Sequence, residues 1–177
     1  MTIHPVTGTV TQAAMRALMP ADMPEVSRLH ERVFGPGRYA RTAYRVREGA
    51  PKGTPLLSQY CRCVAVGPRL LGSLNMTKVS IGGTGDALLL GPVAVDPEFA
   101  NQGFGRSMIN DAIDAARKDG VKLMLLVGDA PYYARMDFVA VPTGQITLPG
   151  PVNPARLLAI ELQPGVLDSY RGKVTAR

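Results

Sequence analysis

Two apolar runs flank one amphipathic segment between residues 87 and 127 of the chain. Ala87–Val95 and Val121–Val127 are almost continuously apolar, as is typical of strands buried on both faces of a sheet. Between them, apolar residues recur at helical spacing from Phe104 to Ala116, and charged residues occupy the opposite face. Gly120 follows a last turn with two basic residues, which marks a helix end. The pattern predicts a strand, a crossover helix and a second, parallel strand.

Weaker patterns predict the rest of the fold. Asp22 is expected to cap a first helix, with Glu25 as its partner in a capping box. Pro92 lacks an amide hydrogen and predicts a bulge in its strand. The other expected elements are strands at Met15–Met19, Tyr60–Val66, Leu70–Ser80, Phe138–Val141 and Leu157–Leu162, a helix over Arg38–Glu48, an edge strand at Lys173–Thr175, turns at residues 67–68 and 82–85, and an extension over residues 1–12.

The net charge of +6 narrows the range of partners. Such a charge suits nucleic acid, an acidic membrane surface or a ligand with several phosphates. We expect no nucleic-acid partner, because the chain has neither a stacking-aromatic pattern nor a helix-turn-helix signature. No apolar run reaches the length of a membrane span, and the first residues do not resemble a signal peptide, so we expect no membrane partner and a cytoplasmic location. Basic residues are concentrated between Arg28 and Lys52, most simply as a solvated face.

Cys61 and Cys63 lie on one face of a predicted strand. Cysteines two residues apart can hardly close an unstrained disulfide, and the two histidines of the chain are distant in sequence from them, so no set of metal ligands is expected. We interpret both cysteines as core thiols.

A loop with two glycines connects the first strand of the central unit to its helix. It reads Asn101-Gln102-Gly103-Phe104-Gly105-Arg106-Ser107. Glycines allow several amides to point into one concavity at the positive end of the helix dipole, which favours an anion. Met108 replaces the third glycine of a dinucleotide-binding loop, and no P-loop pattern is present. Without further context, a tight turn with no ligand explains the loop equally well.

The context of this loop resembles a known superfamily. Val95-Asp96-Pro97-Glu98-Phe99 leads into Gly103-Phe104-Gly105, and Tyr133-Ala134-Arg135-Met136-Asp137-Phe138 follows the second strand. Together they resemble the GNAT superfamily of N-acetyltransferases. The segments Leu90–Val95 and Gly128–Tyr133 most resemble a largely uncharacterised bacterial branch. The resemblance implies an α/β fold in a single domain over residues 1–177, with a central mixed sheet of about six or seven strands, about four helices and one splayed parallel pair of strands around acetyl-CoA.

The resemblance also implies which residues bind the coenzyme. Strand backbone groups would bond the pantetheine arm, and the glycine loop would hold the pyrophosphate. The implied coenzyme-binding residues are Val93, Ala94, Val95, Asn101, Gln102, Gly103, Phe104, Gly105, Arg106 and Ser107. Three positions depart from the family pattern: Ala100 replaces Gln or Arg, and Asn101 and Asp137 each replace Gly.

Tyr133 is the residue that we expect to carry chemistry. Amine attack on a thioester expels a thiolate, which a phenol can protonate, and the family uses a tyrosine here. The alternative is a buried tyrosine that only packs. Tyr132 is expected to pack, and Asp129 to cap a short helix. The proton of the amine would leave through water, Asp86, Asn75 or His30, although a histidine on an apolar helix face more often packs.

The resemblance thus implies transfer of an acetyl group from acetyl-CoA to a primary amine of an unidentified acceptor. The three departures keep a second hypothesis open, a GNAT-fold acyl-CoA-binding sensor or interaction module with weakened catalysis. In the family the first two helices border the acceptor site, so the arginines between Arg28 and Lys52 favour an acceptor that is acidic near its amine. A homodimer is also left open.

Overall fold

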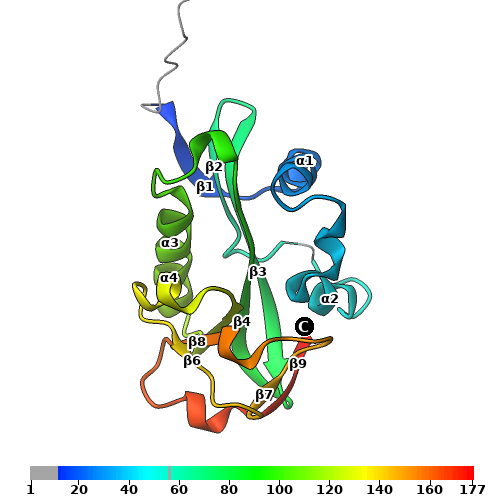
Figure 1. Cartoon of the computed structure of the whole chain (residues 1–177), viewed down its shortest axis with the longest axis vertical. Coiled ribbons are helices and arrows are strands. Elements are labelled where there is room, and N and C mark those ends of the chain that lie inside the picture. The colour runs from blue at the N-terminus through cyan, green and yellow to red at the C-terminus, as the bar shows by residue number, and fades with distance from the viewer. Residues whose placement is uncertain (1–11, 56) are drawn as a thin grey trace, which may run out of the picture.

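The computed structural model describes residues 12–55 and 57–177. The extension expected over residues 1–12 therefore lies almost wholly outside the described residues. One mixed sheet organises the chain (Figure 1). Its main path runs through β1 (Ala14–Ala17), β2 (Arg62–Val66), β3 (Arg69–Ile81), β4 (Thr84–Val95), β5 (Leu123–Val127), β8 (Leu157–Glu161) and β6 (Val139–Ala140). Off this path, β9 (Gly172–Ala176) pairs with β3 and with β7 (Ile146–Thr147).

Four α-helices flank the sheet in the part of the chain that the structure describes: α1 (Met23–Phe34), α2 (Thr42–Glu48), α3 (Phe104–Lys118) and α4 (Ala130–Ala134). Figure 1 shows α1 and α2 on one side of β3 and β4, and α3 and α4 on the other. The β4–β5 pair is parallel and the other pairs of the main path are antiparallel. The predicted fold class is confirmed. The described residues form nine strands, more than the six or seven that the resemblance implies. The strand without a predicted counterpart is β7, whose two residues are too few to form a sequence pattern.

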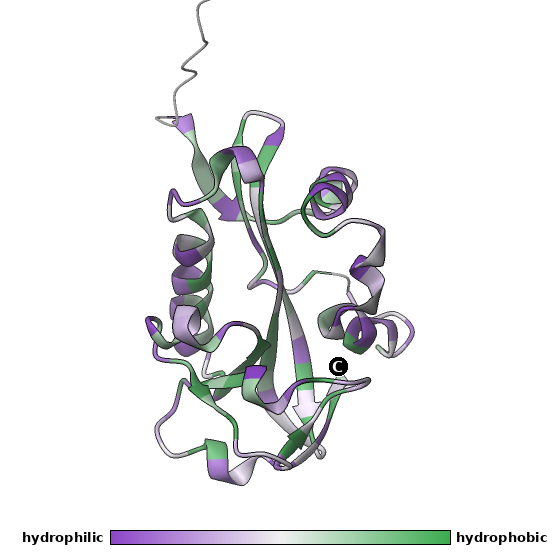
Figure 2. Cartoon of the chain, viewed as in Figure 1, coloured by the Kyte–Doolittle hydropathy of each residue, from purple (hydrophilic) through white to green (hydrophobic). Residues whose placement is uncertain are grey.

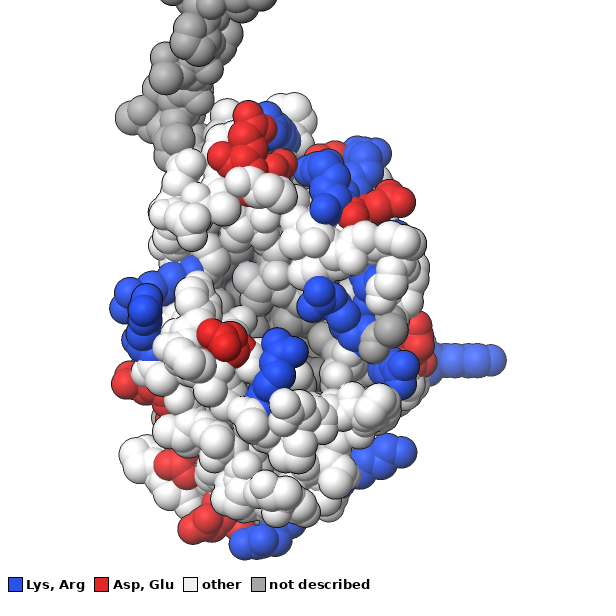
Figure 3. All heavy atoms as spheres, in the orientation of Figure 1, with Lys and Arg blue, Asp and Glu red and all other residues white. Residues whose placement is uncertain are grey.

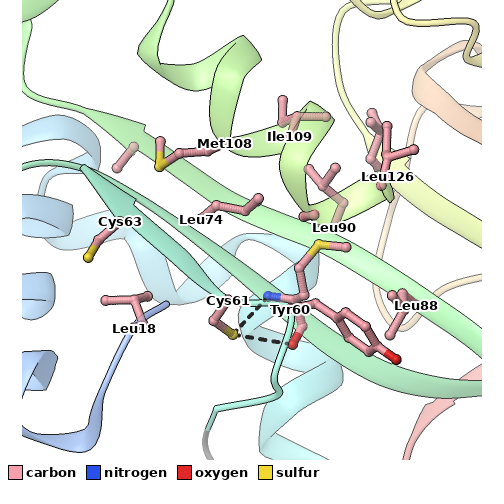
Figure 4. Packing of buried hydrophobic residues seen from close by; sticks show 14 of the residues in the cluster. Leu18, Tyr60, Cys61, Cys63, Leu74, Leu88, Leu90, Met108, Ile109 and Leu126 are labelled. Carbon is pink, nitrogen blue, oxygen red and sulfur yellow. Dashed lines mark hydrogen bonds between the residues drawn. The ribbon is translucent and has the colours of Figure 1, made fainter. Parts of the chain in front are cut away.

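The core lies mainly between α3 and the sheet. Met108 and Ile109 of α3 meet Leu74 of β3, Leu90 of β4 and Leu126 of β5 (Figure 4), and all five are at most 4% exposed. The apolar side of α3 faces the strands, as its colouring in Figure 2 shows. Burial of each such side chain stabilises the fold by about 1.5–3 kcal/mol. This packing holds the end of β4 and the start of α3 in fixed positions.

Both cysteines are free thiols in this core, as predicted. Cys61 and Cys63 are at most 1% exposed. The Cys61 thiol accepts a hydrogen bond from the Met76 amide at 3.3 Å and donates one to the Met76 carbonyl at 3.6 Å (Figure 4).

The prediction for the second helix is wrong at its start. Pro36–Ala40 forms a 3-10 turn and Arg41 is extended, so α2 begins only at Thr42. Extended backbone at Arg41 interrupts the helix, and the Arg41 guanidinium lies 4.2 Å from the centre of the Phe34 ring.

The prediction of a capping box at the start of α1 is also wrong. Asp22 precedes α1, but its carboxylate makes no bond to that helix. It accepts from the Met19 amide at 2.8 Å and pairs with Arg16 at 2.7 Å, and these contacts hold the pKa of Asp22 below its usual range, chiefly through Arg16. Glu25 pairs instead with Arg28, at 2.7 Å.

The turn between β3 and β4 is tighter than predicted. Only Gly82 and Gly83 lie between the paired residues Ile81 and Thr84, and both glycines have positive φ. A two-residue hairpin turn of this kind requires left-handed backbone. Thr84 and Gly85, expected in the turn, therefore belong to β4.

Candidate active site

Strands β4 and β5 part halfway along their length. They pair only over Ala87–Leu89 and Leu123–Leu125. Immediately beyond, Gly91 and Pro92 form the predicted bulge, with two residues of β4 opposite Asn75 alone in β3. The extra residue bends β4 away from its parallel neighbour.

A cleft of about 500 Å³ opens where the two strands separate. Figure 3 shows this hollow in the middle of the face, with cationic side chains near its rim. Its walls come from β4, from the end of β5 and α4, from the segment between α1 and α2, and from the loop before β8. The residues that line the cleft include Phe34, Arg41, Val93, Gly128, Asp129, Tyr132, Tyr133 and Arg156.

Tyr133 lies in the wall of this cleft. Its ring packs directly against Gly128 and stands edge-on to Phe138, with 5.8 Å between ring centres. Its hydroxyl has no hydrogen-bond partner among the described residues. Burial, then the neighbouring Tyr132, raises the pKa of Tyr133 to about 12. The phenol therefore stays protonated at every physiological pH and is available to a ligand as a donor.

Two neighbours of Tyr133 differ from their predicted roles. Tyr132, expected to pack, is 41% exposed and lines the cleft, because the five-residue α4 lies over the opening. Asp129 stands before α4 as predicted, but its carboxylate makes no capping bond. Asp129 also lines the cleft, and it is the one carboxylate among the lining residues that the structure describes.

The glycine loop sits at the start of α3, beside the separated strands. Asn101 and Gly103 both have left-handed backbone, with φ of 63° and 81°. Within the described residues, no backbone amide of residues 101–106 donates to another group of the chain; the first that does is Ser107, to the Gly103 carbonyl at 2.9 Å. Several adjacent amides at a helix start are therefore available to an anion.

Gly105, in the first turn of α3, faces β4 and Tyr132. A Cβ at this position would lie 3.7–3.9 Å from Val95, the Tyr132 hydroxyl and Val93, which is ordinary contact. The side of Gly105 without a side chain thus points from the loop toward the cleft wall.

None of the three residues considered as a route for the amine proton lines the cleft. Asp86 pairs with Lys122 at 3.3 Å, before the paired part of β4. The Asn75 side chain is 1% exposed and has no hydrogen-bond partner among the residues that the structure describes. His30 is held by the Tyr44 hydroxyl at 2.5 Å and the Ser73 hydroxyl at 3.0 Å. The sequence did not predict Arg156 as a site residue, although it lines the cleft. It lies in a proline-rich loop without hydrophobic periodicity.

His30 is expected to make the stability of the fold depend on pH. Burial, then Arg47 and Arg38, lower its pKa from 6.5 to about 4. Between these values the unfolded chain binds more protons, so the free energy of unfolding should fall as pH drops from about 6.5 to 4, by up to about 3 kcal/mol. Urea titrations at pH 7 and pH 5 measure this loss. A His30→Gln variant should lose less stability over the same interval, and equal losses would contradict the assignment.

The sheet with its parted parallel strands, the glycine loop and the tyrosine in the cleft define the fold class of the acyl-CoA-dependent N-acetyltransferases. A family model described as an acetyltransferase (GNAT) domain matches residues 14–141. The chain therefore belongs to the GNAT acetyltransferase family.

The individual proteins that the chain resembles share 21–27% sequence identity with it. The chain is 27% identical over 141 residues to the uncharacterized N-acetyltransferase YjhQ of Escherichia coli K12, covering 78% of this chain and 72% of that protein. A GNAT family N-acetyltransferase from Escherichia coli, YhbS, solved with CoA, superimposes with a TM-score of 0.79 at 21% identity, over 97% of this chain and 93% of that one. A GNAT family acetyltransferase from Brucella melitensis, solved with acetyl-CoA, gives a TM-score of 0.67 at 22% identity, over 93% of this chain and 96% of that one.

No helix among the described residues is long and apolar enough to cross a membrane.

Proposed function

We propose that the protein transfers the acetyl group of acetyl-CoA to a primary amine by direct attack. The observation that carries this proposal is the continuity of three features. The unpaired amides at residues 101–106 come first, Gly105 with its neighbours Val93 and Tyr132 comes next, and the cleft with the Tyr133 phenol follows. An extended ligand with phosphates at one end and a reactive thioester at the other fits this order.

In this proposal the coenzyme lies along the separated end of β4. Amides of the loop from Asn101 to Ser107, with the Arg106 side chain, hold the pyrophosphate. The pantetheine arm bonds backbone groups of Val93, Ala94 and Val95, which no longer pair with β5. The structures of YhbS with CoA and of the Brucella protein with acetyl-CoA belong to relatives of the same fold, and they make acetyl-CoA a reasonable donor here.

The reaction needs one proton to leave nitrogen and one to reach sulfur. The amine attacks the thioester carbonyl, the C–N bond forms and the C–S bond breaks. Tyr133 donates a hydrogen bond to the sulfur as negative charge develops and gives up its proton as the thiolate leaves. The proton released by the amine, through solvent in the cleft, restores the phenol.

The departures from the family pattern give little support to a catalytically weakened sensor. Asn101 and Asp137 both have left-handed backbone, with φ of 63° and 66°. Among residues with side chains, Asn and Asp tolerate this conformation best. The two substitutions for glycine thus keep the backbone that glycine would adopt, and only Ala100 remains as a chemical difference.

Two measurements test the proposal together. Calorimetry with acetyl-CoA measures binding, and a free-thiol assay with a broad panel of primary amines measures transfer. We expect saturable binding and amine-dependent release of CoA. Absence of binding would overturn the proposal, whereas tight binding without release for any amine would favour the sensor.

Gly105→Ala is a sharper test of where the coenzyme lies. Its Cβ would make only ordinary contacts with Val93, Val95 and Tyr132, so thermal stability should hardly change. In the proposed binding mode, however, the methyl group would project toward Val93 and Val95, where the pantetheine arm bonds the backbone. We expect acetyl-CoA to bind about tenfold more weakly by calorimetry. Gly37→Ala, where nothing lies within 4 Å of the added Cβ, is the matched control. Equal affinity of both variants would place the coenzyme elsewhere.

A further inference from the structure

The cleft contains two arginines without an acidic partner. Arg41 enters from the segment between α1 and α2, and Arg156 from the loop before β8. Neither forms an ion pair with any described residue. Several arginines outside the cleft do have such a partner: Arg16 pairs with Asp22, Arg28 with Glu25, Arg62 with Asp111 and Arg69 with Glu98. The cleft thus holds two guanidinium groups without a counter-charge from the described residues.

Both guanidinium groups are held in position by other contacts. The Arg41 guanidinium stacks on Phe34, 4.2 Å from the ring centre. The Arg156 Nε donates to the Gly128 carbonyl at 3.2 Å, which leaves its two terminal nitrogens for a ligand. A guanidinium fixed in this way loses little further freedom when it binds an oxyanion, and its fork matches carboxylate and phosphate geometry.

The phosphates of the coenzyme do not account for these cations. In the proposed binding mode the pyrophosphate lies at residues 101–107, and none of those residues lines the cleft. Arg156 instead lies close enough to Tyr133 for its charge to lower the pKa of the phenol, against the larger effect of burial. Arg41, Arg156 and Tyr133 all line the same cleft, so in this binding mode both arginines lie at the thioester end of the coenzyme, where the acceptor must enter.

Asp129 supplies the opposite charge in the same cleft. Its carboxylate does not cap α4, and its charge also reaches Tyr133, whose pKa it raises. An ammonium group near Asp129 would stand beside the phenol and therefore beside the departing sulfur. The cleft thus offers one site for an amine and two cations within a volume of about 500 Å³.

We propose that the acceptor is a small amine with an anionic group, a carboxylate or a phosphate, close to that amine. Arg41 and Arg156 bind the anion and Asp129 attracts the amine. This inference rests on the proposed acetyltransferase function and names its substrate class.

Matched acceptors test the inference in the free-thiol assay with the full chain and acetyl-CoA. The panel contains α-amino acids, their carboxamides, ethanolamine phosphate and ethanolamine. We expect kcat/KM at least tenfold higher for the anionic member of a pair. The amino-acid and phosphate pairs show which anion is used. If carboxamides and ethanolamine react as well as their anionic counterparts, the acetyltransferase function stands and the inference falls.

Variants locate the anion. Arg156→Gln and Arg41→Gln should each raise KM for the anionic acceptor about 10- to 100-fold and change kinetics with its neutral counterpart less than threefold. Arg117→Gln, an exposed position on α3, removes the same charge and should change neither. Equal effects on anionic and neutral acceptors would mean a structural role and would overturn the inference.

A binding measurement keeps the inference testable if no amine of the panel reacts. In ¹⁵N-labelled protein with CoA, the arginine Nε–H signals are followed by NMR during titration with N-acetylalanine, with N-acetylalaninamide and with inorganic phosphate. We expect saturable shifts with an anion and none with the amide, and no shifts in the double variant of Arg41 and Arg156. Failure of the proposed function appears separately, as absent coenzyme binding in calorimetry. Arginine signals insensitive to both anions would overturn the inference.

Discussion

Replacing Tyr133 by Phe should lower kcat about 100-fold while leaving the affinity for acetyl-CoA within twofold. The loss follows from removing a donor that acts mainly when charge develops on sulfur, an effect of about 100- to 10,000-fold for positioned acids. Binding should survive because the ring, and not the hydroxyl, packs on Gly128 and Phe138. Steady-state thiol release and calorimetry give the two numbers.

The comparison variant is Tyr132→Phe, because Tyr132 shares the cleft wall and loses the same hydroxyl. It should retain most of the turnover. Single-turnover rates are needed to establish that chemistry limits kcat, since a slow product release would mask the effect. If chemistry limits and Tyr133→Phe still turns over at the original rate, the phenol is a packing residue.

The central unit could be predicted from sequence because each of its parts has a local cause. Continuous apolar runs define β4 and β5, the helical period defines α3, and Pro92 marks the bulge. These signals lie within the segments that they shape, so no distant contact has to be known.

The missed features depend on contacts between segments distant in sequence. Asp22 does not cap α1 because Arg16 of β1 binds its carboxylate. Tyr132 does not pack because α4 lies over an opening made by three other segments. Arg156 becomes a cleft residue only when the loop before β8 folds back on Gly128. Helix or strand propensity and hydrophobic period cannot predict such contacts, which bring together the residues proposed to bind the acceptor.

Asn101 and Asp137, the two residues that replace glycines of the family pattern, have a different meaning in the sequence and in the structure. On sequence alone, Asn101 and Asp137 read as lost glycines and favour a weakened site. In the structure both are the left-handed residues that their turns require. The loop proposed to bind the coenzyme thus keeps the backbone that glycine would adopt, and the charged residues proposed to bind the acceptor come from segments that no local pattern marked.

Gly128→Ala should lower kcat about as much as Tyr133→Phe does, although it leaves the Tyr133 hydroxyl in the protein. The added Cβ would lie 2.3 Å from a Tyr133 ring carbon and 2.9 Å from a Leu126 methyl, so the ring must move. A misplacement of about 1 Å can cost about 100-fold in rate. The ring borders the open cleft and has room to swing, so we expect little change in acetyl-CoA affinity. Gly49→Ala, whose Cβ would lie 3.5 Å from its nearest neighbour, is the control in thermal unfolding and in rate.

The double variant Gly128→Ala with Tyr133→Phe separates a displaced phenol from general damage to the fold. If Gly128→Ala acts by moving the hydroxyl away from the sulfur, it should cost less than threefold in kcat once that hydroxyl is gone, because the two changes remove the same interaction. If instead the effects multiply to about 10,000-fold, the clash disturbs the cleft beyond Tyr133, and the rate loss of the single variant says nothing about the position of the phenol.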